Sequence, residues 1–338
     1  MVNTNMQGVM KAVVFTKYGP PDVLQIREVE KPTPKPNEAL IRIRATTVSA
    51  ADCELRRFDF PGWIWLPVRL WFGLLKPRVR VLGQELAGEI EEIGKDVRSL
   101  KKGDRVFAAT GMRLGAHAEY ICLTEAPMGG AIATMPSNLS FEEAASVPYG
   151  GGEALQFLWK GNIQSGQKVL VNGAGGSFGT FAIQLAKSFG AQVTAVDSTA
   201  KLELLRSIGA DHVIDYTREE FTDSNETYDV IFDVVRNSPS RRMVRSLWEN
   251  GIYLTANPGL SQLLLALWTS MTSRKRVIIG VPSGTNEDLA FLRGMIEAGK
   301  IHPVIDQCFS LEQIAEAHRS AESGQKKGNV VITVKHDH

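Results

Sequence analysis

Four glycines in the middle of the chain are spaced for binding a dinucleotide: Gly173, Gly175, Gly176 and Gly179. Missing side chains permit a tight turn, close backbone approach to a pyrophosphate and close packing of a helix on a strand. The phosphates would then lie on amide groups at the start of that helix, where the dipole favours negative charge. Asp197 follows Gly179 by eighteen residues, about where an acidic side chain binds the ribose hydroxyls of adenosine. An ordinary glycine-rich turn with a solvent-facing Asp is the alternative.

The elements around these glycines fit that chemistry. An apolar run at 169–171 predicts a buried parallel strand, and the segment after Gly179 carries apolar residues typical of a helix. After Pro148, predicted strands alternate with helical stretches, which indicates a doubly wound parallel sheet. The six expected strands are 168–172, 192–197, 212–214, 229–235, 251–256 and 276–281.

The residues before Pro148 predict a mostly β, barrel-like domain, because short β segments are punctuated by Gly and Pro. The expected strands are 11–15, 23–30, 39–48, 86–93, 104–108 and 117–123. The last fifty residues contain a helix-like segment, 311–321, and an apolar strand, 329–334. We assign both to the first domain.

Composition fits a two-domain enzyme without an electrostatic partner. At 338 residues the chain has length for about two domains, and its net charge of +1 gives no general attraction to nucleic acid. Three widely spaced cysteines, Cys53, Cys122 and Cys308, favour a reducing compartment over a disulfide framework. The first ten residues lack the pattern of a signal peptide, so we expect a cytoplasmic protein.

Several motifs together carry a family resemblance over essentially the whole chain. The segments are KAVVFTKYGPPDVLQIREVEKPTPKPNEALIRI, LGQELAGEIEEIGKDVRSLKKGDRVF, the glycine turn, GADHVIDY and KKGNVVITV. In this order they resemble the zinc-independent medium-chain dehydrogenase/reductases, the quinone oxidoreductase branch. The resemblance implies a mostly β GroES-like catalytic domain at 11–148 and 285–338, interrupted by a Rossmann domain at 149–284. It also implies a nicotinamide cofactor held between the two.

The resemblance also addresses zinc. In zinc-binding relatives the ligands are a Cys three residues before an Asp, a His in a Gly-His-Glu triplet, and a Cys or carboxylate near the domain junction. Here those positions are Ser49 before Asp52, Gln84 and, less securely aligned, Tyr149. None is a customary zinc ligand, and the four-cysteine structural zinc loop is absent, so we expect no metal. The alternative is a metal held by Glu85, Asp52 and Cys53. Ala51 stands where zinc relatives carry a Ser or Thr proton relay.

Without a Lewis acid, the chemistry suits quinones or α,β-unsaturated carbonyls, because conjugation spreads the charge left by hydride addition. We expect Ser49 and Gln84 to donate to the developing oxyanion, Asp52 to organise them, and Tyr149 to donate a hydrogen bond or proton. Purely structural roles for Ser49, Gln84 and Tyr149 remain open. The alternative functions are an alcohol or aldehyde dehydrogenase, and a cofactor-binding protein with little turnover.

The choice between NAD and NADP rests on conflicting residues. Asp197 favours NAD, since a carboxylate repels a ribose phosphate, whereas Ser198 and Lys201 resemble the phosphate-binding pattern of NADP users. Lys201 is most simply a solvated residue in the first turn of a helix, and we lean to NAD. The predicted cofactor contacts are Gly173, Ala174, Gly175, Gly176, Ser177, Phe178, Gly179, Asp197, Ser198, Lys201, Tyr216, Val234, Asn257 and Asn329.

Two apolar segments remain, 58–75 and 260–271. The first contains three Trp and three Phe but is interrupted by Pro61, Pro67 and Arg69, so it is no transmembrane helix. We interpret it as a lid over an apolar pocket, with core packing, an oligomer contact and shallow membrane contact as alternatives. In relatives the strand expected at 276–281 pairs across a two-fold axis, which implies a homodimer.

Overall fold

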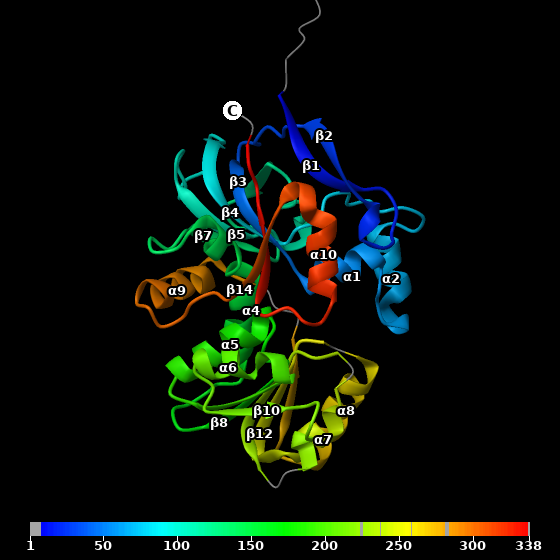
Figure 1. Ribbon diagram of the computed structural model, residues 1–338, viewed down its shortest axis with the longest axis vertical. Coiled ribbons are helices and arrows are strands. Elements are labelled where there is room, and N and C mark those ends of the chain that lie inside the picture. The colour runs from blue at the N-terminus through cyan, green and yellow to red at the C-terminus, as the bar shows by residue number, and fades with distance from the viewer. Residues whose placement is uncertain (1–7, 224–225, 237, 258, 281–283, 337–338) are drawn as a thin grey trace, which may run out of the picture. The chain divides into compact units, whose positions relative to one another are not determined.

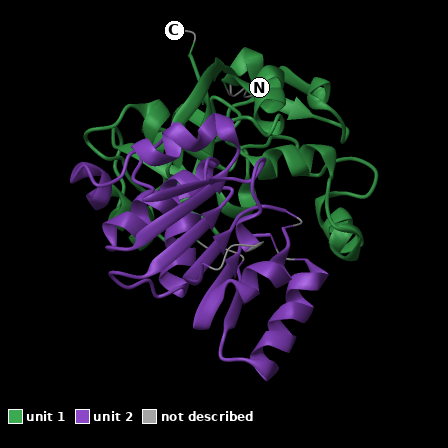
Figure 2. Ribbon diagram, turned by 60° about the horizontal axis from the view of Figure 1, so that its bottom comes forward, with its two compact units in different colours: residues 1–149, 284–293, 305–338 green, residues 150–283, 294–304 purple. Residues whose placement is uncertain are grey.

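The computed structural model describes residues 8–336 except 224–225, 237, 258 and 281–283. It consists of two compact units (Figure 2). Unit 1 comprises Met1–Tyr149, Gly284–Arg293 and Ile305–His338, and unit 2 comprises Gly150–Ser283 and Gly294–Val304. The stretch Gly294–Val304 therefore groups with unit 2, although the sequence analysis places it in the first domain.

Unit 2 contains a six-stranded sheet in which every strand pair is parallel (Figure 1). Its order is β10-β9-β8-β11-β12-β13. The strands are β8 (Lys168–Asn172), β9 (Gln192–Asp197), β10 (His212–Asp215), β11 (Tyr228–Asp233), β12 (Leu247–Thr255) and β13 (Arg276–Ile279). The chain order reverses between β8 and β11, which makes their carboxyl ends the switch point where ligands bind in such sheets. The predicted Rossmann sheet is confirmed.

One helix of unit 2 precedes the sheet along the chain, and the others lie between its strands. They are α4 (Pro148–Lys160, which begins in unit 1), α5 (Ser177–Ser188), α6 (Leu202–Ser207), α7 (Ser240–Arg245) and α8 (Leu260–Thr272). Strand β8 is buried from Val169 to Asn172, and α5 is buried along most of its length. Continuous apolar strands of this kind fit a sheet covered on both faces. The predicted strand at 276–281 extends beyond β13 into residues outside the described part.

Unit 1 is built around a mostly antiparallel sheet of order β14-β15-β3-β4-β5-β7, with β6 paired to β3 and a separate β1-β2 pair. Its strands are β1 (Val9–Phe15), β2 (Leu24–Glu30), β3 (Glu38–Val48), β4 (Glu85–Ile93), β5 (Arg105–Ala109), β6 (Tyr120–Thr124), β7 (Ala131–Thr134), β14 (Ile305–Ser310) and β15 (Asn329–Thr333). Its helices are α1 (Ala50–Arg57), α2 (Gly62–Phe72), α3 (Phe141–Ala145), α10 (Ile314–Glu322) and most of α9 (Asn286–Glu297).

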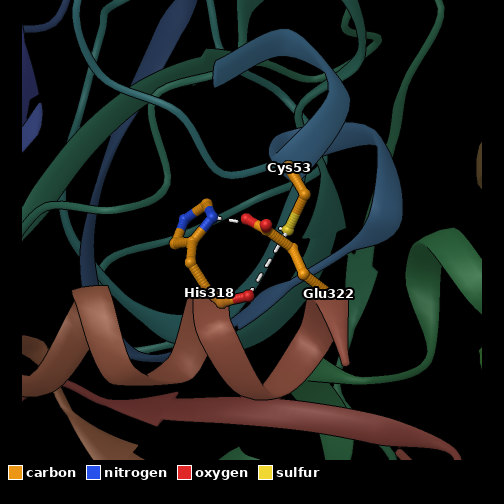
Figure 3. Close-up of side chains that lie close together, drawn as sticks. All are labelled: Cys53, His318 and Glu322. Atoms are coloured by element: carbon orange, nitrogen blue, oxygen red, sulfur yellow. Dashed lines mark hydrogen bonds between the residues drawn. The ribbon is translucent and has the colours of Figure 1, made fainter. Parts of the chain in front are cut away.

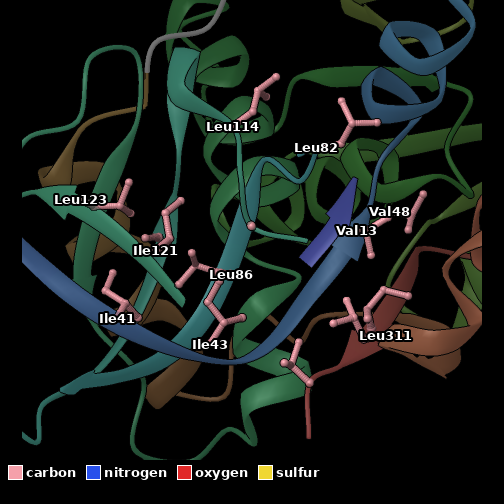
Figure 4. Packing of buried hydrophobic residues seen from close by; sticks show 14 of the residues in the cluster. Val13, Ile41, Ile43, Val48, Leu82, Leu86, Leu114, Ile121, Leu123 and Leu311 are labelled. Carbon is pink, nitrogen blue, oxygen red and sulfur yellow. The ribbon is translucent and has the colours of Figure 1, made fainter. Parts of the chain in front are cut away.

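The core of unit 1 joins residues from both ends of the chain (Figure 4). Ile41 and Ile43 of β3 and Leu86 of β4 are fully buried, and Leu311 and Val330 from the C-terminal segment belong to the same cluster. Strand β15 pairs antiparallel with β3, Val330 opposite Val48. The predicted GroES-like sheet domain is confirmed.

Some elements differ from the sequence predictions. The segment expected as a lid forms helix α2, and strands β7 and β14 were not predicted. The expected helix at 311–321 is a 3-10 turn followed by α10. Among the described residues, every helix is too short or too polar to cross a membrane.

Candidate functional site

The glycine turn lies between β8 and α5, at the carboxyl edge of the unit 2 sheet. Gly173 has φ +80°, in the left-handed region, and both its amide and that of Ala174 donate to the Val196 carbonyl of β9 at 3.1 Å. A Cβ on Gly179 would lie 2.5 Å from the Cα of Ala174. The turn is thus held against β9, and α5 packs directly on it.

The start of α5 suits a pyrophosphate. Gly176 is its N-cap residue, and no side chain caps the helix there. The first amide groups of a helix lack partners within it and attract anions. Ser177 and Phe178 open this helix. The residues present therefore fit the phosphates of a dinucleotide.

Asp197, at the end of β9, is already engaged within the turn. It is buried, its Oδ2 accepts the Gly175 amide at 2.7 Å, and its Oδ1 accepts the Ser198 amide at 2.8 Å. Lys201 Nζ lies 3.3 Å from Oδ1. The expectation that Lys201 is solvated is wrong, because the residue is only 6% exposed and its side chain lies against Gly175. The ammonium group and the two backbone amides offset the cost of burying this carboxylate.

The carboxyl end of β11 forms a second polar cluster beside the turn. Asp233 is fully buried and accepts hydrogen bonds from Asn172 Nδ2 at 2.9 Å and from Tyr253 Oη at 2.5 Å. Burial raises the pKa of its carboxyl, against the opposing effect of these donors. Val234 follows Asp233, and its carbonyl accepts Asn257 Nδ2 at 2.7 Å. Two of the predicted cofactor contacts are thus bonded to one another at the switch point.

Two further predicted contacts lie at the margins of the sheets. Tyr216 follows β10, is 60% exposed, and donates its amide to the Asp197 carbonyl at 3.2 Å. Asn329 is buried at the start of β15 in unit 1, opposite Ile305.

In unit 1, three of the predicted catalytic residues meet at the start of α1. Asp52 is fully buried, and its Oδ2 accepts the amide and the hydroxyl of Ser49 at 2.9 and 2.6 Å. Ser49 Oγ in turn accepts the Asp52 amide at 3.1 Å, which completes a capping box. Gln84 Nε2 donates to Ser49 Oγ at 3.2 Å. We call Ser49, Asp52 and Gln84 the polar cluster.

The loop before β4 fixes this cluster from the other side. The Gly83 amide donates to Asp52 Oδ1 at 2.9 Å. Gly83 has φ +100°, and a Cβ there would lie 2.6 Å from the His117 amide nitrogen, so only glycine fits. The side chain of Gln84 is thereby directed from a constrained backbone to Ser49.

Tyr149 is joined to the same region through its backbone. Its amide donates at 2.7 Å to Oε2 of Glu85, the residue after Gln84, and Thr47 Oγ1 donates to Oε1 at 2.5 Å. Burial raises the pKa of the Glu85 carboxyl to about 7, with a smaller contribution from nearby Asp52. Glu85 thus connects the backbone of Tyr149 to Gln84 of the polar cluster.

The donor set at these positions does not fit zinc. Ser49, Gln84 and Tyr149 offer no customary ligand atom. Both oxygens of Asp52 already accept N–H or O–H groups. The polar groups at these positions therefore already serve as hydrogen-bond donors and acceptors for one another and for the backbone.

Among the described residues, the cluster of potential metal ligands is Cys53, His318 and Glu322, on α1 and α10 (Figure 3). Cys53 Sγ lies 3.4 Å from His318 Nδ1. Arg56 is fully buried beside them, donates through Nε to His318 Nδ1 at 3.3 Å and forms an ion pair with Glu322. The guanidinium already supplies the positive charge, so this group is a buried ion-pair cluster that joins α1 to α10.

Burial sets the protonation states there. It raises the pKa of the Cys53 thiol to about 12 and lowers the pKa of His318 well below its usual range. His117 and Arg56 lower the pKa of His318 further. A neutral thiol and a neutral imidazole suit a structural role.

Gly83, Asn172 and Asp233, which help to build these sites, were given no role from the sequence, and Glu85 was named only as a possible metal ligand. The capping box was visible as Ser-Ala-Ala-Asp, a pattern that marks a helix start. The Asn172–Asp233 bond joins the ends of two adjacent strands and needed the strand order, which sequence alone does not give.

Comparisons with known proteins agree with both units. The model of the alcohol dehydrogenase GroES-like domain matches residues 35–134, and that of a zinc-binding dehydrogenase matches 208–332. The chain is 34% identical to a 2-methylene-furan-3-one reductase of Solanum lycopersicum, over 96% of this chain and 79% of the relative. It is 32% identical to a chloroplastic NADPH-dependent alkenal/one oxidoreductase of Arabidopsis thaliana, with the same coverage.

Solved structures show the same fold. The quinone oxidoreductase from Coxiella burnetii matches with a TM-score of 0.87 and 27% identity, over 97% of this chain and all of that one. The sequence motifs, the two units and these matches have one explanation: the chain belongs to the medium-chain dehydrogenase/reductases, in their quinone oxidoreductase branch.

Proposed function

We propose that this protein is an NAD(P)H-dependent oxidoreductase that reduces quinones or α,β-unsaturated carbonyls by hydride transfer. The names of its relatives, which include a furanone reductase and an alkenal/one oxidoreductase, support this substrate class. The observation that carries the proposal is the polar cluster, which has neutral hydrogen-bond donors at the positions of zinc ligands. Conjugated acceptors need only such modest help, whereas simple ketones require stronger stabilisation of charge on oxygen.

Gln84 is the proposed donor to the substrate oxygen. Its Nε2 carries two hydrogens and gives one to Ser49 Oγ, so the second remains for a ligand. The side chain of Gln84 is half-buried, so a ligand can reach it while the bond to Ser49 holds it in place.

Ser49 and Asp52 are proposed as positioning residues for Gln84. Ser49 donates its single hydroxyl proton to Asp52, so in this arrangement it cannot also donate to a substrate. This differs from the expectation that Ser49 is a direct donor. Tyr149 remains the proposed second donor or proton source.

The nicotinamide cofactor supplies the hydride. In unit 2 the glycine turn and the start of α5 would hold its phosphates, and Asp197 and Ser198 would lie at its ribose. We propose a preference for NADH over NADPH, because Lys201 is held by Asp197 rather than turned outward toward a ribose phosphate. Val234 and Asn257 would lie near the nicotinamide end of the switch point.

A substrate panel tests the proposal. Purified protein is given NADH or NADPH with quinones, enones and simple ketones, and NAD with simple alcohols, and nicotinamide absorbance is followed. Quinones or enones should be reduced at least tenfold faster than simple ketones. Faster turnover of alcohols, together with stoichiometric zinc in a metal assay, would favour an alcohol dehydrogenase. Tight cofactor binding without any oxidation would favour a binding protein.

We also propose a homodimer. Strand β13 is the last strand of its sheet, and α8 beside it exposes apolar side chains. The exposed residues of α8 are Leu260, Leu263, Leu264, Leu267, Trp268 and Met271. An unpaired strand edge next to an apolar helix is suited to two-fold pairing. Analytical ultracentrifugation should give twice the 37.1 kDa chain mass, and Val277→Pro should shift the mass toward one chain.

A further inference from the structure

Helix α2 exposes an apolar surface that the proposed reaction does not use. None of its residues is buried, and Trp71 is 67% exposed. The surface continues past the helix to Leu75, which is 89% exposed. We name it the α2 face, and it consists of Trp63, Leu66, Leu70, Trp71, Leu74 and Leu75. Contiguous exposed apolar groups of this size mark an interaction site.

The opposite side of α2 is fixed to unit 1. The guanidinium of Arg69 lies 4.0 Å from the ring centre of Tyr18 and 4.4 Å from that of Phe58, and its Nε donates to the Leu74 carbonyl at 2.8 Å. Trp65 packs edge-to-face on Phe58, with ring centres 5.7 Å apart. Tyr18 also donates its hydroxyl to the Phe72 carbonyl at 3.0 Å. The helix is therefore anchored from within while its apolar side faces outward.

Positive charge accompanies the α2 face. Residues 60–84 contain four basic side chains and no acidic one, although the whole chain carries a net charge of only +1. Lys76, Arg78 and Arg80 are exposed, and within the described part of the chain none of them forms an ion pair. Arg78 donates to the Trp71 carbonyl at 3.5 Å, a neutral acceptor. These cations are available to a negatively charged partner.

We propose that the α2 face docks this protein on the surface of an anionic lipid bilayer. An apolar helix of 11 residues is too short to span a bilayer but can lie in its interface. Tryptophan prefers that boundary, and adjacent Lys and Arg gain from the negative surface potential. The three features occur together in one segment: exposed Trp and Leu, neighbouring cations outside any ion pair, and an absence of acids.

The charge pattern argues against a second copy of the chain on this face. A two-fold contact places the same patch on both sides, so Lys76, Arg78 and Arg80 would face their own copies without a counter-charge. An anionic bilayer supplies that counter-charge.

Vesicle flotation tests the inference with the full-length protein. Vesicles of phosphatidylcholine alone are compared with vesicles containing one-third phosphatidylserine, at low and high salt. Binding should require the anionic lipid and weaken with salt. Arg78→Gln with Arg80→Gln should reduce affinity by about thirtyfold. Leu70→Ser with Trp71→Ser should reduce it at least tenfold, because the apolar burial of two large side chains is lost.

Matched controls separate docking from folding. Trp248→Ser removes another exposed Trp, and Lys101→Gln with Lys102→Gln removes two other exposed cations; both should bind vesicles as the wild type does. All variants should retain the wild-type melting temperature. Equal binding by the wild type and the α2 variants would overturn the proposal. So would a halving of the solution mass in Leu70→Ser with Trp71→Ser, because the face would then be an interface between copies. Both outcomes are independent of the substrate panel, so the docking proposal can fail while the proposed reaction stands.

Discussion

The glycine turn of unit 2 is held in place mainly by its own backbone amides. The polar cluster of unit 1 is instead built from the side chains of Ser49, Asp52 and Gln84. In the turn, an added methyl group is the damaging change, since Gly179 packs on the backbone of Ala174. In the polar cluster, the damaging change is the loss of one hydrogen-bonding group. Mutations in the glycine turn and mutations in the polar cluster should therefore have different consequences.

The largest effect is expected from Gly179→Ala. The new Cβ would lie 2.5 Å from the Ala174 backbone, so α5 must move away from the turn, at a cost of about 2–3 kcal/mol. Cofactor affinity measured by fluorescence titration should fall roughly a hundredfold, and the melting temperature should drop. Gly152→Ala in α4 is the control, because a Cβ there meets nothing within 4 Å. Normal cofactor binding by Gly179→Ala would contradict the claim that an added methyl group damages the glycine turn.

Glu85 should make unit 1 sensitive to pH. Burial raises the pKa of its carboxyl from 4.5 to about 7, so the folded state binds the proton more tightly than the unfolded chain does. Its stabilising contribution is complete below pH 4.5 and is lost as pH rises through 7, by about 2–3 kcal/mol between pH 5 and 8. Urea unfolding at both pH values should show this loss, and Glu85→Gln should reduce it. Glu28→Gln, on exposed β2, should keep the wild-type slope.

Gln84→Leu should slow catalysis without affecting the nucleotide turn. Loss of the proposed donor should lower kcat on a good enone about 10- to 100-fold, while cofactor affinity stays at the wild-type value. Tyr149→Phe should give a smaller decrease. Gln25→Leu, on the exposed side of β2, serves as the control. Unchanged rates for Gln84→Leu and Tyr149→Phe would remove both from the mechanism.

Asp197→Asn tests the proposed role of Asp197 in the preference for NADH. Removal of the carboxylate breaks the ion pair with Lys201 and ends repulsion of a ribose phosphate, so the ratio of kcat/KM for NADPH over NADH should rise about tenfold. Glu203→Gln, on exposed α6, should leave the ratio unchanged. An unchanged ratio in Asp197→Asn, or a strong wild-type preference for NADPH, would contradict the proposed role of Asp197.

The smallest effect is expected from Ser49→Ala. Loss of the N-cap should cost about 1 kcal/mol of unfolding free energy. The fall in kcat should be about threefold, because Gln84 loses the Ser49 acceptor that positions it but keeps its own donor group. Ser140→Ala is a matched control, since Ser140 and Glu143 form the same capping box on α3. A fall in kcat for Ser49→Ala larger than that for Gln84→Leu would restore Ser49 as a direct donor.

The two regions also differ in how well the sequence predicted them. The bounds of β8 and β9 were predicted to the residue, because the turn, its flanking strands and Asp197 are all encoded within 30 consecutive residues. The pairing of Lys201 with Asp197 was not predicted, since pattern alone cannot show which way a first-turn lysine folds. The polar cluster required the family resemblance, because Ser49 and Gln84 are 35 positions apart.

The ion-pair cluster lay beyond any local pattern. Arg56 and His318 are separated by 262 positions, and the residues around Arg56 in the sequence do not predict that its side chain is buried. Likewise, the composition of 58–75 showed an apolar segment, but only the structure reveals that the α2 face is exposed while Arg69 and Trp65 anchor the helix.

The Arg56–His318 contact has a consequence for synthesis on the ribosome. Arg56 is translated long before its partner His318 on α10 and before β15, which pairs with β3. Unit 2 lies between Arg56 and α10 in the chain, and all six strands of its sheet have been synthesised before α10. The unit that carries Ser49 and Gln84 therefore stays incomplete, with Arg56 unpaired and part of its core missing, until α10 and β15 have been synthesised.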